Sequence, residues 1–187
     1  MKAAYISLLV LVASGCAAPS LTYVEPLQGD RARVRFSTGT TGVTIVRSYD
    51  DSGCRTNEKE WMRLIDGNVP LIESAPRRLG MPGWYQHKNA AKEVYVDASK
   101  PHTFLFVGNE TSGTLSYRCG VPLTFQFEKN RDYELSFHLM SAQCKVTVFE
   151  LNEKASGATR TALKTFDNHI DPETEMCLQQ FNRQRWQ

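Results

Sequence analysis

The side chains best suited to catalysis in this chain are its four histidines, His87, His102, His138 and His169. They lie far apart in the sequence, and none belongs to a zinc-binding His-Glu-x-x-His motif. The Gly-x-Ser-x-Gly turn of serine hydrolases and the glycine-rich loop that cradles phosphates are also missing from the sequence. His138 alternates with apolar neighbours, which predicts a place on the exposed face of a strand. We therefore expect no enzymatic activity, no metal and no cofactor, and a hydrolase acting on peptidoglycan or lipid is the least favoured alternative.

Three arginines, Arg31, Arg33 and Arg35, alternate with small or apolar residues in the first part of the chain. On a β-strand they would share one face. Guanidinium groups bind carboxylates and phosphates, so this face could hold an anionic lipid or glycan headgroup. The simpler interpretation, which we favour, is a solvated strand face whose arginines pair with nearby acids.

A second cluster mixes cationic and aromatic side chains within residues 67–91, a segment rich in Gly, Pro and basic residues. The candidate binding residues in it are Arg77, Arg78, Trp84 and Tyr85. Such mixtures are common on protein recognition surfaces. They equally suit a long, structured loop that folds down onto a sheet, and the sequence leaves both interpretations open.

Cys16 is chemically distinctive because the fifteen residues before it read as a secretory signal. Lys2 supplies a positive start, an apolar run covers residues 3–12, and small side chains precede the cysteine. The run is shorter than the roughly 20 apolar residues that span a bilayer. We expect residues 1–15 to be a signal peptide.

The stretch VLVASGC resembles the lipobox of bacterial lipoproteins, although Ala13 stands where that motif usually has leucine. The resemblance implies cleavage before Cys16 and a lipidated N-terminus that carries fatty acids such as palmitate. Residues 16–21 would be a lipidated tether for a single domain covering residues 22–187. Ala17, and not an aspartate, follows the cysteine, and this pattern implies an outer-membrane lipoprotein that faces the periplasm.

The charge of the chain is close to neutral, at +2 before removal of the signal peptide. Near-neutrality gives no support for a nucleic-acid partner or for binding to a strongly anionic surface. The membrane contact would therefore come from the N-terminal lipid, since several acyl chains give a stable anchor.

Four cysteines remain besides Cys16, namely Cys54, Cys119, Cys144 and Cys177. An even number in an exported chain indicates two disulfides, and the absence of Cys-x-x-Cys spacing argues against a metal site. Cysteine number alone leaves three connectivities open.

Apolar and polar residues alternate with a period of two along most of the chain, which is typical of half-buried β-strands. We expect a mainly β fold, an antiparallel β-sandwich with a short C-terminal helix. The expected strands lie near residues 32–36, 43–46, 93–98, 103–107, 115–117, 123–127, 133–139 and 144–151.

The register of the stretch from residue 119 to residue 151 can be proposed from this alternation. A turn after Phe127 would set that residue opposite Tyr133 in a hairpin, and a second turn at residues 141–142 would set Val146 opposite Phe137. Every large apolar side chain then shares one face.

This meander places Cys119 across from Ser141 and beside Cys144, because the turn at residues 141–142 would set both sulfurs at the same end of the meander. We therefore predict a Cys119–Cys144 disulfide, and Cys54–Cys177 by elimination.

Two segments lack the strand pattern. Asn57 and Glu60 resemble a helix cap before Trp61, which predicts a short helix over about residues 58–66. Asp-Pro-Glu at 171–173 is a typical helix start, and predicts a helix over about residues 172–182 that Cys177 fastens to the domain.

The chain resembles a group of uncharacterised proteobacterial lipoproteins in three stretches: ARVRF, RRLGMP and YRCGVPLTFQFEKNRDYELSFHLMSAQCKVTVFEL. The resemblance covers most of residues 32–151 and implies a small β-sandwich-like lipoprotein without an assigned activity. We expect a membrane-anchored, non-enzymatic envelope lipoprotein with a structural or protein-binding role. The alternative is an accessory or inhibitor lipoprotein of a secretion or envelope-maintenance system that binds a protein through residues 67–91.

The lipid anchor can be tested directly. If Cys16 carries the lipid, Cys16→Ser should give a soluble or uncleaved form, and labelled palmitate should no longer enter the protein. Label that persists in the variant would contradict the assignment.

Overall fold

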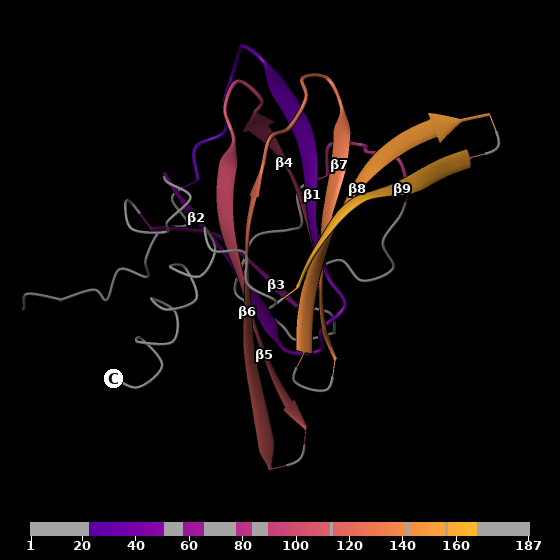
Figure 1. Ribbon diagram of the computed structural model, residues 1–187. Coiled ribbons are helices and arrows are strands. Elements are labelled where there is room, and N and C mark those ends of the chain that lie inside the picture. The colour runs from indigo at the N-terminus through magenta and orange to yellow at the C-terminus, as the bar shows by residue number, and fades with distance from the viewer. Residues whose placement is uncertain are drawn as a thin grey trace, which may run out of the picture.

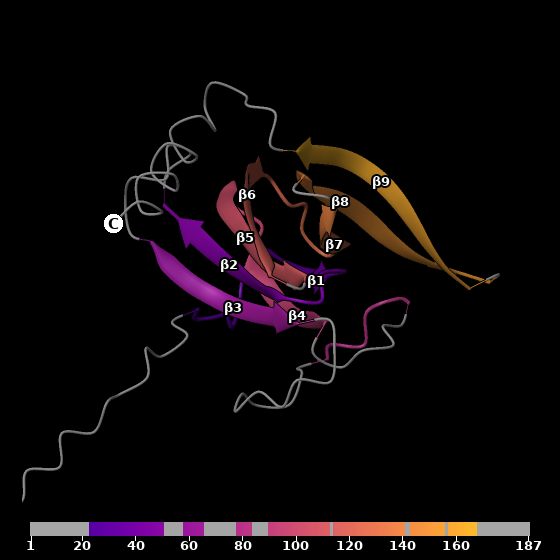
Figure 2. The same ribbon diagram turned by 90° about the horizontal axis from the view of Figure 1, so that it is seen from below.

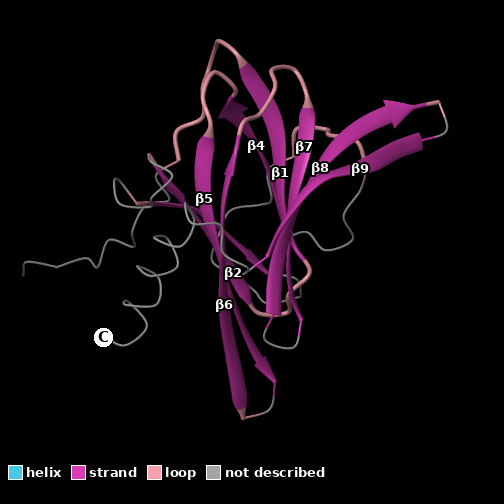
Figure 3. Ribbon diagram, viewed as in Figure 1, coloured by secondary structure: helices cyan, strands magenta, loops and turns pink. Residues whose placement is uncertain are grey.

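The computed structural model describes residues 23–50, 58–65, 78–83, 90–112, 114–140, 143–155 and 157–167. These ranges contain strands and connecting loops but no helix (Figure 3). The strands are β1 (Arg31–Thr38), β2 (Val43–Tyr49), β3 (Lys59–Ile65), β4 (Ala91–Asp97), β5 (His102–Ser112), β6 (Leu115–Phe125), β7 (Asp132–Met140), β8 (Gln143–Lys154) and β9 (Gly157–Asp167). No helix in the described ranges is therefore long and apolar enough to cross a membrane.

The strands form two sheets that pack against each other (Figures 1 and 2). One has five strands in the order β4-β1-β7-β8-β9, and the other has four in the order β3-β2-β5-β6. Neighbouring strands are antiparallel except β1 and β7, which are parallel. The expected β-sandwich is confirmed, while the expected C-terminal helix lies outside the described residues.

An aromatic cluster fills the core between the sheets. Phe36 of β1 is completely buried, and its ring lies 5.3 Å from Phe104, 5.9 Å from Trp61 and 6.0 Å from Phe106, measured between ring centroids. Gly108 is required opposite Phe137, because a Cβ atom at Gly108 would come within 2.4 Å of that ring. The core is therefore tightly packed from both sheets.

The predicted helix over residues 58–66 is wrong, because Lys59–Ile65 forms β3 at the edge of the four-stranded sheet. Its register with β2 shifts so that Trp61 is an extra residue between the pairs Arg47↔Glu60 and Val46↔Met62. A β-bulge of this kind interrupts the period of two, and both Trp61 and Met62 are buried. Because of the bulge, the alternation of apolar and polar residues does not predict this strand.

The predicted register of β7 and β8 is confirmed, with Phe137 opposite Val146. The predicted hairpin between β6 and β7 is wrong, because β6 pairs with β5 in the other sheet and β7 lies between β1 and β8. Phe127 and Tyr133 still meet, but as rings 5.3 Å apart in the core and not as strand partners. The turn between them carries the chain from one sheet to the other.

The Cys119–Cys144 disulfide is confirmed, with the two Cα atoms 6.0 Å apart. It joins β6 of one sheet to β8 of the other, so it links the two layers of the sandwich and not neighbours in one meander. Cys16, Cys54 and Cys177 lie outside the described residues, and the Cys54–Cys177 bridge stays a prediction.

β9 is a strand for which the sequence gives no clear signal, because its side chains are mostly small, polar or charged and largely exposed. Among the described strands it pairs with β8 alone, and the hairpin of these two strands curves away from the rest of the sandwich at its tip (Figure 1). Leu163 is an extra residue in this pairing, between Ala162 opposite Phe149 and Lys164 opposite Val148.

Removal of the disulfide should weaken the fold through the entropy of the unfolded chain. The bridge spans 25 residues, so the variant Cys119→Ala/Cys144→Ala should lose roughly 3 kcal/mol of unfolding free energy. Denaturant titration of the variant and of the oxidised parent protein measures the difference. A loss well below about 1 kcal/mol would show that the bridge does little to hold the two sheets together.

Candidate functional site on the outer face of the five-stranded sheet

Alternation along β1 separates an apolar face from a cationic face. Ala32 and Val34 are buried in the core, and Arg31, Arg33 and Arg35 lie on the opposite, outer face of the five-stranded sheet. This division follows the sequence pattern. The expectation that the whole outer face is solvated is wrong, because Arg35 is only 2% exposed.

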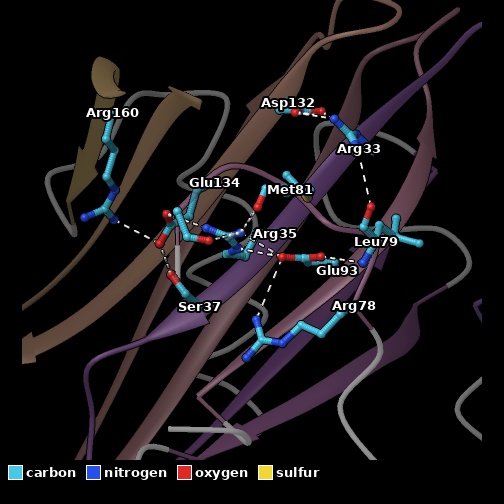
Figure 4. Close-up of polar contacts among 11 residues, drawn as sticks. Arg33, Arg35, Ser37, Arg78, Leu79, Met81, Glu93, Asp132, Glu134 and Arg160 are labelled. Atoms are coloured by element: carbon cyan, nitrogen blue, oxygen red, sulfur yellow. Dashed lines mark hydrogen bonds and ion pairs between the residues drawn. The ribbon is translucent and has the colours of Figure 1, made fainter. Parts of the chain in front are cut away.

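Arg35 lies between two buried acids that come from the strands on either side of it (Figure 4). Glu93 of β4 and Glu134 of β7 are its partners in the strand register. The Arg35 Nη2 and Nε atoms donate to Glu93 Oε1 at 2.7 and 3.0 Å, and Arg35 Nη1 lies 3.8 Å from Glu134 Oε2. The side chains of all three residues are at most 3% exposed.

Two partly exposed arginines and one buried hydroxyl group add further interactions around this centre. Arg160 of β9 donates to Glu134 Oε1 at 3.0 Å, and the Ser37 hydroxyl donates to the same oxygen at 2.6 Å. Arg78 places its Nη1 atom 3.8 Å from Glu93 Oε1. Because one buried guanidinium cannot neutralise two carboxylates, Arg78 and Arg160 supply the positive charge that would otherwise be missing.

The same network fastens the segment 78–83 to the sheet. Arg35 Nη2 donates to the carbonyl oxygens of Met81 and Gly83, each at 3.2 Å, and Arg33 Nη1 donates to the carbonyl oxygen of Leu79 at 3.3 Å. The Leu79 N–H in turn donates to Glu93 Oε2. This part of the loop is therefore folded down on the sheet, as one of the two sequence interpretations expects.

The candidate binding residues of the loop are only partly placed. Arg78 is described, and its side chain is 35% exposed. Arg77, Trp84 and Tyr85 lie outside the described residues. The structure thus places the base of the loop and one of its four candidate residues.

The other two arginines of β1 are also engaged. Arg33 donates from Nε and Nη2 to the two carboxylate oxygens of Asp132, at 2.6 Å each, and this bidentate hydrogen bonding raises the pKa of Arg33. The Arg31 guanidinium lies over the Tyr95 ring, 4.0 Å from its centroid. Carboxylates of the chain itself thus occupy the positions on Arg33 and Arg35 at which an anionic headgroup would bind.

His138 is the one histidine on this sheet face within the described residues. Its Nε2 atom lies 3.0 Å from the hydroxyl oxygen of Ser136, and burial lowers the pKa of the imidazole. Gly39 packs against the other side of the ring, where a Cβ atom would come within 2.7 Å of Nδ1. Among the described residues, no acid hydrogen-bonds to this imidazole. Half-burial also differs from the exposed position that the sequence predicts for His138.

The sequence pattern identified the arginines of β1 as candidates but not the two acids that pair with Arg35. Glu93 and Glu134 each occupy a polar position of an alternating strand, and this alternation is a signal that could have identified them. That pattern does not predict which strands lie next to β1. In the described part of the chain, no group of His, Cys, Asp and Glu side chains is arranged to hold a metal ion.

Removal of the central cation should destabilise the fold strongly. Arg35→Met leaves Glu93 and Glu134 without their shared buried partner, so we expect a loss of about 3–5 kcal/mol in the free energy of unfolding. The matched control is Arg33→Met, which breaks a more exposed pair and should cost no more than about 1 kcal/mol.

A second variant separates lost charge pairing from lost packing. Arg35→Met combined with Glu93→Gln and Glu134→Gln should recover part of the stability that Arg35→Met loses, because no unpaired buried charge remains. Equal effects of Arg35→Met and Arg33→Met in denaturant titrations would contradict the central role of Arg35.

Comparison of this chain with protein-family models, with curated proteins and with solved structures found no match. The function proposed below therefore rests on the residues of the chain itself.

Proposed function

We propose that this protein is a non-enzymatic envelope lipoprotein that is anchored in the outer membrane by lipid on Cys16, faces the periplasm and binds a protein partner. The proposal is supported at the N-terminus by the signal-like residues 1–15 and by the lipobox resemblance around Cys16. It is supported in the folded domain by the way the sheet holds the segment 78–83.

The observation that carries the binding role is the fixation of this segment by the buried Arg35–Glu93 pair. Three backbone groups, from Leu79, Met81 and Gly83, hydrogen-bond to the two charged side chains. A loop that is already ordered loses less conformational entropy when it binds, so a rigid base favours tight and specific recognition.

The residues that border this base have the chemistry of a recognition surface. Arg77 and Arg78 precede it, and Trp84 and Tyr85 follow it directly. Arginine, tryptophan and tyrosine are the residue types most enriched at binding hot spots. The partner surface would accordingly be acidic with apolar pockets, and an accessory or inhibitor role in a secretion or envelope-maintenance system would use the same residues.

The proposed anchor would keep this surface near the membrane. Six residues lie between Cys16 and Tyr23, the first described residue, and the seven steps from one to the other span at most about 25 Å even in a fully extended chain. The partner would therefore be a protein in or close to the outer membrane.

Site-specific photocrosslinking in intact cells tests the binding surface. A photoreactive residue at Trp84 should give one adduct of defined mass, whereas the same residue at Lys154, exposed near the tip of the β8–β9 hairpin, should give none. Arg78→Gln should reduce the yield at position 84 by about tenfold, as expected for the loss of a hot-spot cation, and Lys154→Gln should leave it unchanged. Equal adducts at both positions, or no effect of Arg78→Gln, would refute the proposed surface.

A further inference from the structure

A cleft of about 340 Å³ lies away from the ion-pair network, at the end of the sandwich where β4 ends and β5 begins. Its lining includes aromatic rings from four different segments and two lysines, namely Tyr23, Tyr49, Trp61, His102, Lys59 and Lys100. Its volume is at the lower end of the range for small-molecule sites, which suits a ligand of one or two rings.

The aromatic wall of the cleft is held in a fixed geometry. Tyr23 stacks on Trp61 with ring centroids 3.7 Å apart, and Trp61 in turn meets Phe104 edge-on at 4.9 Å. The Tyr23 hydroxyl donates to the carbonyl oxygen of Tyr95 at 2.5 Å, which fixes the outer ring of the stack. The wall therefore offers an ordered aromatic surface without the entropy cost of arranging it on binding.

Polar groups suited to a ligand border these rings. The Trp61 indole N–H donates no hydrogen bond to any described residue. Its nitrogen is not one of the completely buried side-chain atoms that lack a hydrogen-bond partner. The Ser48 side chain adds a hydroxyl group to the lining, whereas the Tyr49 hydroxyl already hydrogen-bonds to Glu58. A wholly apolar ligand would leave such donors unpaired, so the lining favours a ligand with hydroxyl or amide oxygens.

The lining of the cleft carries charges of both signs, from two lysines and two acids. Lys59 and Lys100 are exposed and form no ion pair with any described residue. Asp97 is engaged, because its Oδ1 atom accepts from the Ser99 N–H at 2.9 Å and from the Ser99 hydroxyl at 2.7 Å, and these hydrogen bonds lower the pKa of Asp97. Asp50, the other acid of the lining, also has an interaction partner.

We propose that this cleft binds an anionic sugar. The apolar C–H face of a pyranose ring would pack on the aromatic wall, its oxygens would accept from the Trp61 indole N–H, and its carboxylate would lie between Lys59 and Lys100. The aromatic face alone would accept many apolar groups. Its combination with a hydrogen-bond donor and with two lysines that form no ion pair with a described residue favours an acidic carbohydrate.

The choice of probe rests on the proposed envelope location, where peptidoglycan supplies such a sugar. The disaccharide of N-acetylglucosamine and N-acetylmuramic acid carries a lactyl carboxylate, and chitobiose is the matched neutral probe without it. Calorimetric titration of the full-length protein in detergent micelles should show the acidic disaccharide binding about tenfold more tightly.

Three variants test the individual contacts. Lys59→Gln/Lys100→Gln should abolish the preference for the acidic disaccharide, and the matched control Lys154→Gln/Lys164→Gln on the β8–β9 hairpin should retain it. Tyr23→Ala should weaken binding of both sugars, because it removes the outer ring of the wall. Near-ultraviolet circular dichroism and the thermal midpoint show that each variant is folded.

Failure to bind either sugar at millimolar concentration would overturn the proposal. Equal binding of the two sugars, or a preference that survives in Lys59→Gln/Lys100→Gln, would overturn it as well. Sugar binding and crosslinking from position 84 are separate measurements with separate control variants, so failure of this proposal and failure of the proposed protein-binding role give different results.

Discussion

The structure depends on one constraint, which is that the guanidinium of Arg35 is buried and must be paired. A charge removed from water is tolerated only with partners of opposite sign and good hydrogen-bond geometry. Glu93 and Glu134 supply these partners from the two strands that flank β1, and the backbone of residues 79–83 accepts further hydrogen bonds. One side chain therefore connects three strands and a loop in one arrangement.

The two faces of the five-stranded sheet are held by different forces. The inner face is apolar and packs against the other sheet, and the Cys119–Cys144 bridge ties the two layers together. The outer face is held by ion pairs, and β9 reaches it through Arg160. β9 is an edge strand among the described strands, and its bulge at Leu163 together with its cationic side chains disfavours pairing with another chain.

Period-two alternation predicts which strand face most residues of the candidate site occupy. It does not predict that this face is buried. The pattern ARVRF places Arg33 and Arg35 on one face, and similar patterns place Glu93 and Glu134 on the polar faces of their strands. No local feature indicates that β9 and the segment 78–83 cover this face. The difference between a solvated arginine and a buried one is thus decided by chain segments far away in the sequence.

Alternation in the sequence indicates the strand character of most of the described domain and the pairing of Phe137 with Val146 across β7 and β8. The Cys119–Cys144 bridge is also predicted correctly, but from a hairpin of β6 and β7 that does not form. Long-range packing places β6 and β7 in different sheets and makes residues 59–65 a strand. The physical reason is that alternation indicates which face of a strand is apolar, and a short turn indicates pairing with the next strand in the sequence. Every alternating strand can hydrogen-bond to every other, so the choice among distant partners comes from the packing of the whole core.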